Sequence, residues 1–178
     1  MKYGELTLGQ IEALVNKHGG MEGVRRFLSG VSEVVVREQV DTIIRRVRVN
    51  HLRNPDAMLN ATGRKQYVTD SVVAAMPRGE GDEADVHFFK IGQWTSDDDL
   101  EQEYAKRGLK PADSYSLAAV NEADPGFADE RPNGTHWKDA DGKWCYIGFL
   151  RGGAERYVSV HRFDDDWGDH WWFAGLRK

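Results

Sequence analysis

Five of the six tryptophans of the chain lie between Thr135 and Lys178, and this stretch constrains the fold more than any other. Turn-forming residues divide it into four segments that are rich in aromatic and β-branched residues, as strands are. The segment between the first two, Asp139-Ala140-Asp141-Gly142, has the composition of a type I turn with glycine in the left-handed conformation. The stretch is therefore predicted to be a meander of four antiparallel strands: Thr135–Asp139, Lys143–Leu150, Arg156–Phe163 and His170–Ala174.

The two middle strands of this meander are apolar on both faces, whereas a sheet with one solvated face alternates apolar and polar residues. Two interpretations stay open. Either helices and loops of the chain cover both faces, or one face belongs to the core and the other binds a partner. Because side chains alternate between faces along a strand, we expect Trp144 and Trp171 to share the core face with the valines of the third strand. Trp172 is expected on the face of Cys145.

The remaining chain has the patterns of short helices and a few strands. Of its 178 residues, 40% are apolar and 30% are charged, which is typical of one folded domain. Capping residues and helical spacing predict helices near residues 7–18, 21–28, 66–76, 95–107 and 114–121. Two strands are expected between Val31 and Arg53, the first near Val34–Val36 and the second near Thr42–Val49, and Asn54-Pro55-Asp56 is expected to form a turn. We therefore predict a single α+β domain over residues 1–178, with the meander packed against helices and a candidate internal boundary near residues 78–84.

Several classes of protein and site are not indicated by the sequence. No apolar run is long enough to span a bilayer, and residues 1–5 lack the apolar core of a signal peptide. A single cysteine forms neither an internal disulfide nor a cysteine-rich zinc site. There is no Walker A motif, glycine-rich dinucleotide turn, HExxH or GxSxG pattern. We therefore expect a cytoplasmic protein with no cofactor and no membrane partner.

The distribution of charge suggests one binding surface. Residues 1–78 carry a balance of +4 and residues 79–178 a balance of −9, which together give the net charge of −5. The densest positive patch is formed by Arg45, Arg46, Arg48 and Arg53. Such a patch binds phosphates, so weak, salt-dependent binding of polyanions is expected. The alternative is an edge strand that its charges protect from aggregation.

Cys145 is the one candidate nucleophile. If residues 151–155 form a five-residue loop that pairs Leu150 with Arg156, then Cys145 lies opposite His161 on the same face of the sheet. A neighbouring imidazole lowers the pKa of a thiol and activates it. A shift of one residue in the register moves His161 to the other face. The alternative is that Cys145 is a small buried apolar residue.

The acidic segment between the third and fourth strands is a candidate metal site. Carboxylate oxygens and imidazole nitrogens there match the ligands that divalent cations use, although their spacing fits no EF-hand or zinc pattern. The alternative is a solvated hairpin loop. The candidate ligands are Asp164, Asp166, Asp169 and His170.

Parts of the sequence resemble a recurrent class of small bacterial proteins with no assigned activity. The resemblance is carried by residues 6–20 (LTLGQIEALVNKHGG), 108–113 (GLKPAD), 121–125 (NEADP) and 134–138 (GTHWK). It implies a bacterial, cytosolic setting and no particular chemistry.

Taken with the surfaces above, the leading expectation is a non-enzymatic binding or interaction module. Its contact residues would be the four arginines together with Trp137 and Trp172, and its partner another protein or, through Arg45–Arg53, a nucleic acid. The alternative is a small thiol- or metal-dependent enzyme centred on Cys145, His161 and the Asp164–Asp169 loop.

Overall fold

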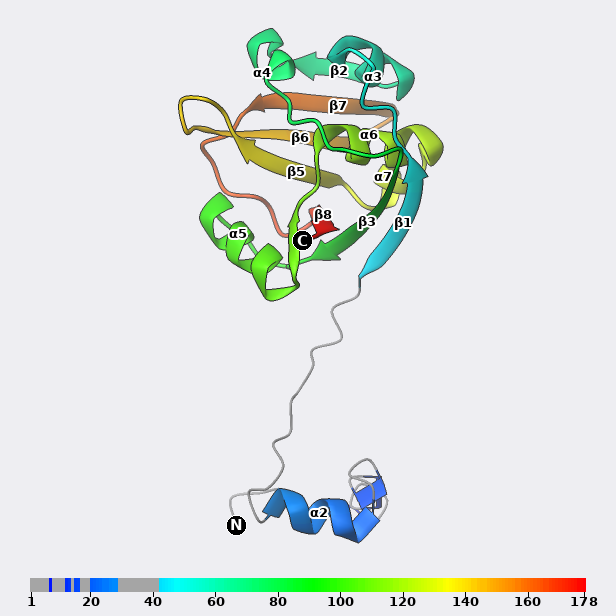
Figure 1. Cartoon of the computed structure of the whole chain (residues 1–178), viewed down its shortest axis with the longest axis vertical. Helices are drawn as coiled ribbons and strands as arrows, with labels where there is room; N and C mark the ends of the chain where they lie inside the picture. Colours follow the sequence, from blue (N-terminus) through cyan, green and yellow to red (C-terminus); the bar gives the residue numbers. More distant parts are fainter. Residues whose placement is uncertain (1–6, 8–11, 14, 17–19, 29–41) are drawn as a thin grey trace. The chain divides into compact units, whose positions relative to one another are not determined.

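Strands from the C-terminal stretch lie in the middle of an eight-stranded sheet in the computed structural model (Figure 1). The structure describes residues 7, 12–13, 15–16, 20–28 and 42–178. The strands are β1 (Ile43–Arg48), β2 (Lys65–Val68), β3 (Glu83–Lys90), β4 (Leu109–Pro111), β5 (Asn133–Lys138), β6 (Trp144–Gly152), β7 (Glu155–Arg162) and β8 (Trp172–Arg177). The helices are α2 (Gly20–Leu28), α3 (Pro55–Ala61), α4 (Asp70–Ala74), α5 (Asp97–Lys106), α6 (Ser114–Ala123) and α7 (Phe127–Glu130).

The chain divides into two compact units, residues 1–39 and 40–178. In the first unit, α2 agrees with the helix expected over residues 21–28. The strand expected near Val34–Val36 lies outside the described residues. Residues 78–84, the candidate boundary, lie within the second unit, where the Cα of Gly79 packs so closely on Asp113 that a Cβ would lie 2.4 Å from its Oδ2. The sheet and the helices α3–α7 belong to the second unit.

The α+β class is confirmed, but the sheet is mixed. Its strand order is β1-β3-β8-β5-β6-β7-β2, with β4 paired to β8. Strands β5, β6 and β7 are consecutive and antiparallel as predicted. The predicted place of the fourth strand, beside the third, is wrong. Strand β8 does not pair with β7 but with β3, β4 and, in parallel, β5. Through β8, the strands β5, β6 and β7 are thereby joined to β3 and β1, which precede them in the chain.

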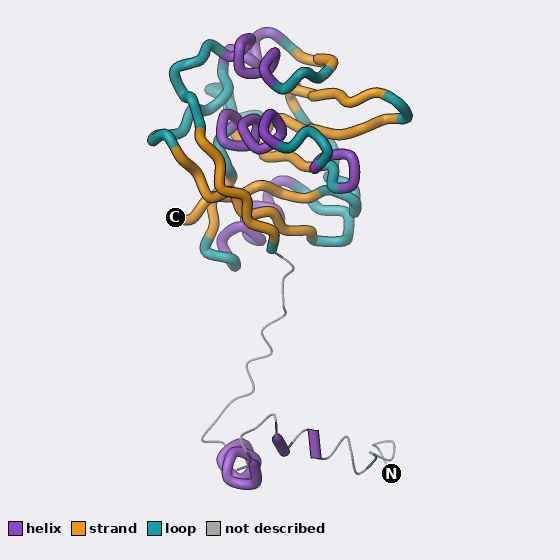
Figure 2. The backbone as a smooth tube through the Cα atoms, turned by 90° about the vertical axis from the view of Figure 1, so that its right-hand side faces the viewer, coloured by secondary structure: helices purple, strands orange, loops and turns teal. Residues whose placement is uncertain are grey.

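Helices and loops cover both faces of the sheet, which confirms the first of the two interpretations of the apolar strands. One face packs against α3, α4, α6 and α7 in a large core that includes Leu59, Leu117, Ile147 and Val158. The other face packs against α5 and the loop before β8 in a smaller core around Leu100, Tyr104 and Trp167. Figures 1 and 2 show α3 and α4 beside β2 and β7, with α5 at the opposite end of the sheet.

The hairpin of β6 and β7 determines which residues share a face, and its predicted register is wrong by one residue. Leu150 pairs with Tyr157 instead of Arg156. The strands run on into the expected loop and turn at Gly153, whose φ of 59° suits the first central position of a two-residue type II′ turn. Val158 and Val160 therefore lie on the face of Cys145 and not on that of Trp144.

The tryptophans divide between the two faces as follows. Trp172 packs against the larger core that contains Cys145, as expected. Trp171 packs against the smaller core together with Trp167, so the expected grouping of Trp144 and Trp171 with the valines is wrong. Two paired glycines of β5 and β6, Gly134 and Gly148, leave room for these indoles. A Cβ there would lie 3.1 Å from the Trp167 ring or 2.8 Å from the Trp171 ring.

Two further segments differ from the prediction because tertiary contacts decide them. The first residues of the helix expected over residues 66–76 instead belong to β2, which pairs in parallel with β7, and only α4 is helical. The turn expected at Asn54-Pro55-Asp56 is the start of α3, where Asn54 accepts a hydrogen bond from the Ala57 N–H and Pro55 occupies the first turn. No helix in the described ranges is long and apolar enough to cross a membrane.

Candidate functional site

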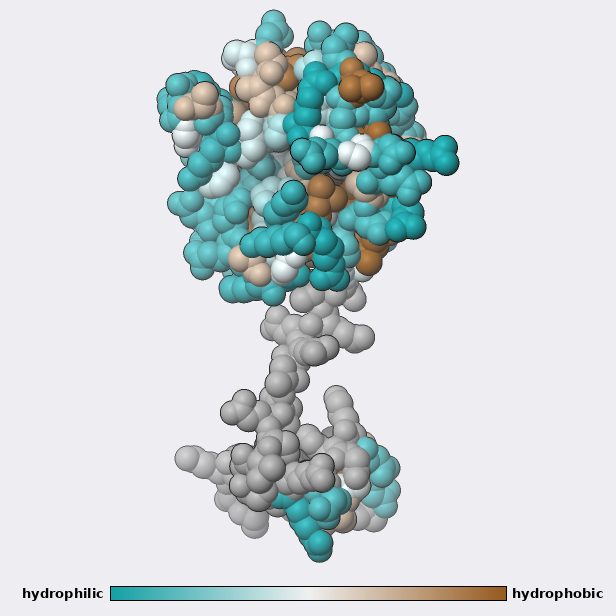
Figure 3. Space-filling model, viewed as in Figure 1, coloured by the Kyte–Doolittle hydropathy of each residue, from teal (hydrophilic) through white to brown (hydrophobic). Residues whose placement is uncertain are grey.

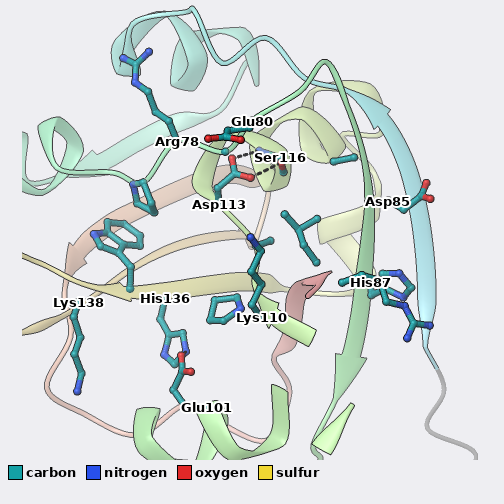
Figure 4. Close-up of a pocket in the computed structure, with 18 of the residues that line it drawn as sticks. Arg78, Glu80, Asp85, His87, Glu101, Lys110, Asp113, Ser116, His136 and Lys138 are labelled. Carbon is teal, nitrogen blue, oxygen red and sulfur yellow. Dashed lines mark hydrogen bonds and ion pairs between the residues drawn. The ribbon is translucent and has the colours of Figure 1, made fainter. Parts of the chain in front are cut away.

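A cleft opens where β5 and β8 diverge. These two strands pair only at Asn133–Trp172 and Gly134–Phe173, and beyond this point β4 takes the place beside β8. The end of β5 therefore borders a cleft of about 1260 Å³ instead of a strand. Its charged and polar lining is drawn in Figure 4, where Lys110 lies between Asp113 and Ser116 on one side and Glu101 and His136 on the other.

His136, on β5, is the most unusual group in the lining of this cleft. Its side chain is fully buried, and Nδ1 donates a hydrogen bond of 2.5 Å to Oδ1 of Asp97, the first residue of α5. The same oxygen accepts a hydrogen bond of 2.8 Å from Nε1 of Trp167. The imidazole lies flat on the Trp144 ring, with centroids 4.5 Å apart and an angle of 8° between the planes. Residues from α5, β6 and the loop before β8 thus meet around one imidazole of β5.

Glu101 lies one helical turn after Asp97 and brings a second carboxylate to His136. Its Oε1 is 3.0 Å from Nε2 of His136, although the contact misses the direction of an aligned hydrogen bond. Burial alone would lower the pKa of His136, but its contacts with Asp97 and Glu101 outweigh this effect and raise the pKa. Contact with His136 lowers the pKa of Glu101. These contacts therefore favour the charged imidazolium, which would lie between two carboxylates.

The opposite wall of the cleft is built on Asp113, the N-cap residue of α6. Its Oδ1 accepts hydrogen bonds from the backbone N–H groups of Tyr115 and Ser116, and its Oδ2 accepts one from the Ser116 hydroxyl. Nε2 of His51 lies 3.3 Å from Oδ1. Because the Asp113 carboxylate is already engaged by these groups, it forms a fixed wall and does not provide a free charge.

The cationic side chains that line the cleft are not paired with acids. In the described part of the chain, no carboxylate lies within 4.0 Å of the charged nitrogens of Arg78, Lys110, Lys138 or Arg177. Four of the six carboxylates of the lining do have basic partners: Glu83 with Arg48, Asp85 with Arg46, Glu101 with His136, and Asp113 with His51. The unpaired charges of the cleft are therefore mainly positive.

The predicted basic patch does not present four free charges. Arg46 binds Asp85 at 2.8 Å, Arg53 binds Glu122 at 2.6 Å, and Arg48 lies 3.9 Å from Glu83. The guanidinium of Arg45 lies over the ring of Phe127, 4.8 Å from its centroid. These residues belong to β1, at the edge of the sheet, or follow it. Their arrangement fits the alternative interpretation, an edge strand carrying charge.

The two predicted binding tryptophans are half-buried and lie apart. Trp172 is in β8, packs against the larger core and has the guanidinium of Arg131 over its ring at 5.9 Å. Trp137 is in β5 and lines the cleft, and its buried Nε1 has no hydrogen-bond acceptor among the described residues. Of the two, only Trp137 belongs to the candidate site.

The predicted pairing of Cys145 with His161 is wrong. Cys145 pairs with Arg162, whereas His161 lies opposite Tyr146 and its Nδ1 is 2.9 Å from the Thr69 hydroxyl. The one-residue difference in register, caused by the tight turn at Gly153, places the two side chains on opposite faces. Burial raises the pKa of the Cys145 thiol, and the nearby Asp139 carboxylate raises it further. The thiol is buried and donates weak hydrogen bonds to Oδ2 of Asp139 and to the Lys143 carbonyl, at 3.9 and 3.8 Å, which favour its protonated form.

We therefore expect Cys145 to be unreactive in the folded protein. Its side chain is fully buried, and a protonated thiol is a poor nucleophile. A disulfide exchange reagent such as Ellman's reagent should label the native protein far more slowly than the protein unfolded in urea. Native labelling at the rate of the unfolded chain would contradict this interpretation.

The acidic loop does not gather its candidate metal ligands. Asp164, Asp166, Asp169 and His170 are exposed, and the part of the chain that the structure covers holds no group of three or more potential ligands placed around one point. The loop turns inward at Trp167, whose backbone N–H and C=O both pair with Thr95. Its role in the structure is to bring Trp167 into the smaller core, while the acids face solvent.

Apart from Trp137, the residues that line the cleft were not identified from the sequence. Asp97 fits its expected position at the start of a helix, where a carboxylate is favourable, and nothing local links it to a histidine 39 residues later. The available signal was the pair Asp97 and Glu101, which are four residues apart and therefore share one face of α5. A histidine within the apolar strand β5 was the second signal.

Comparison with known proteins gives no match. No family model matches this chain, and neither a curated protein nor a solved structure matches it significantly. The resemblance to small bacterial proteins therefore stays a prediction, and function is inferred from the cleft.

Proposed function

We propose that residues 42–178 form a binding domain for a small anionic molecule, which occupies the cleft beside β5. The observation that carries this proposal is the set of cationic side chains that line one cleft without a carboxylate partner among the described residues: Lys110, Lys138 and Arg177, together with Arg78, whose guanidinium donates to the His51 carbonyl. Elsewhere in this unit most arginines are paired with acids, including the three arginines of the basic patch that face Asp85, Glu83 and Glu122.

One of two buried donors supports the same class of ligand. Trp137 and His136 both line the cleft, and the buried Nε1 of Trp137 and Nε2 of His136 have no aligned hydrogen-bond acceptor in the described structure. A buried N–H without an acceptor costs about 1–3 kcal/mol, so such groups are normally satisfied. An anion bound beside His136 would supply acceptor oxygens together with negative charge, whereas Trp137, the next residue of β5, faces the other side of the sheet.

A large protein interface has less support. On the face shown in Figure 3, apolar residues form small, separate groups on a mostly hydrophilic surface. The exposed large apolar side chains of this unit lie on different segments, namely Ile44, Leu52, Tyr67 and Trp94. Isolated apolar residues of this kind are usual on protein surfaces and do not mark an interface. The binding class that we predicted is therefore retained, with the cleft as its binding surface.

The proposal is tested by titrating the protein with inorganic phosphate, citrate and benzoate at low ionic strength, using isothermal calorimetry. We expect at least one of these anions to bind, and Lys110→Met to weaken the binding about tenfold, because a charged hydrogen bond contributes about 1.5–3 kcal/mol. Lys143→Met is the matched control, since Lys143 is exposed, has no acid partner and lies outside the cleft. No binding at millimolar concentrations, or equal weakening by both variants, would refute the proposal.

A further inference from the structure

In its contact with His136, the Glu101 carboxylate occupies the position that an acidic group of a ligand would take. His136 is fully buried, its Nδ1 is held by Asp97, and its Nε2 faces Glu101, which lines the cleft with it. Oε1 of Glu101 supplies the nearest negative charge at 3.0 Å, but without an aligned hydrogen bond. A charge-assisted hydrogen bond with good alignment is roughly twice as strong as a neutral one, so this donor is incompletely satisfied.

Glu101 differs from Asp97 in how firmly it is placed. Asp97 is buried and accepts hydrogen bonds from both His136 and Trp167. The Glu101 side chain is 45% exposed, and it has no hydrogen bond from any described residue apart from its contact with His136. It therefore has room to turn toward solvent, which would free Nε2 of His136 for another carboxylate.

The surroundings of Nε2 indicate the rest of the ligand. The Trp144 ring stacks on His136, and Nζ of Lys138 lies over the same indole, 4.4 Å from its centroid. Pro111 and Leu176 add further apolar lining to the cleft. A carboxylate at Nε2 would meet a second cation in Lys138, and a flat apolar group attached to it would lie among these side chains.

Building on the function proposed above, we propose that the cleft takes a small aromatic carboxylate, whose carboxylate group replaces that of Glu101 at Nε2 of His136. Glu101 then competes with the ligand, and its removal strengthens binding. This distinguishes Glu101 from a residue that contacts the ligand favourably, because removal of such a residue would weaken binding.

The test measures benzoate binding by calorimetry in the full chain and in two variants, Glu101→Ala and Asp98→Asn. Asp98 lines the same cleft from the same helix and carries the same charge, but makes no contact with His136. We expect Glu101→Ala to bind benzoate about tenfold more tightly, as the recovery of one charged hydrogen bond predicts, and Asp98→Asn to change the affinity less than about threefold. Benzamide, which lacks the charge, should bind neither variant.

The outcomes separate this inference from the proposed function. Equal tightening by both variants would show a general effect of charge and would overturn the competition by Glu101, as would weaker binding to Glu101→Ala. If phosphate or citrate binds in a Lys110-dependent manner but benzoate does not bind the wild type or Glu101→Ala, the aromatic carboxylate is wrong while the anion site stands. Acetate, titrated in the same way, has the carboxylate without the ring. If benzoate binds no more tightly than acetate, the aromatic part of the ligand is excluded.

Discussion

Replacing Trp167 with alanine is expected to lower the free energy of unfolding by about 3–5 kcal/mol, as truncation of a buried tryptophan typically does. Trp167 is only 1% exposed, and its ring meets those of Tyr146, Trp171 and Phe173 edge-on at centroid distances of 5.1–5.5 Å. Its Nε1 also donates to Asp97, so the substitution removes a hydrogen bond from the carboxylate that holds His136. One change therefore affects both the smaller core and the cleft.

The matched control for this prediction is Trp94→Ala. Trp94 is adjacent to Thr95, which pairs with Trp167, but it is 68% exposed, so a change of at most about 0.5 kcal/mol is expected. Urea denaturation followed by far-ultraviolet circular dichroism measures both variants without relying on tryptophan fluorescence. Trp167→Phe should fall between them, because it keeps most of the ring packing and loses the N–H. Similar stability of the two alanine variants would show that the loop before β8 does not anchor the smaller core.

Local chemistry was sufficient to predict several parts of this fold. Gly142 has a φ of 75°, in the left-handed turn that the sequence Asp139–Gly142 indicates. Helix α5 begins as predicted, with Ser96 capping it and carboxylates in its first turn. The apolar composition of β6 and β7 on both faces correctly indicated two covering layers. Each of these features depends on residues that are close together in the chain.

The features that failed depend on contacts between distant residues. A turn of two residues instead of five at Gly153 shifts the β6–β7 register by one, and this separates Cys145 from His161. The position of β8 depends on β3 and β4, which no pattern within residues 135–178 specifies. The cleft follows from that position, because it opens where β5 loses β8 as a neighbour.

The charge network of the cleft is the second part that local patterns did not reveal. Asp97 and Glu101 have the spacing of an ordinary amphipathic helix, and His136 is one polar residue in an apolar strand. Only the packing of α5 on β5 brings the three together and excludes water from the imidazole. The cations of the cleft are likewise scattered over residues 78–177 in the sequence. Their common feature, the lack of acid partners, is visible only in three dimensions.

Replacing His136 with glutamine is expected to cost about 3–5 kcal/mol near pH 6, since it leaves buried Asp97 without its positive partner. The cost should depend on pH. The pKa of His136 is raised in the folded state, so its contribution to stability is fully present below the unfolded value of about 6.5 and is lost as the pH rises through the higher folded value. The lowered pKa of Glu101 has the opposite effect at acid pH: its contribution is present above the unfolded value of about 4.3 and is lost as the pH falls through the lower folded value.

The measurement is the free energy of unfolding in urea of the wild type and His136→Gln from about pH 5 to 8.5, a range that brackets the unfolded histidine pKa. The difference between them should be largest near pH 5–6 and should shrink as the pH rises. His87→Gln is the control, because burial and the charge of Arg177 lower the pKa of His87. The wild type should therefore lose stability relative to His87→Gln as the pH falls below about 6.5. This change with pH is opposite in sign to the one expected for His136→Gln. A difference for His136→Gln that does not change with pH would mean that His136 is not charged in the folded protein, and the imidazolium between Asp97 and Glu101 would be disproved.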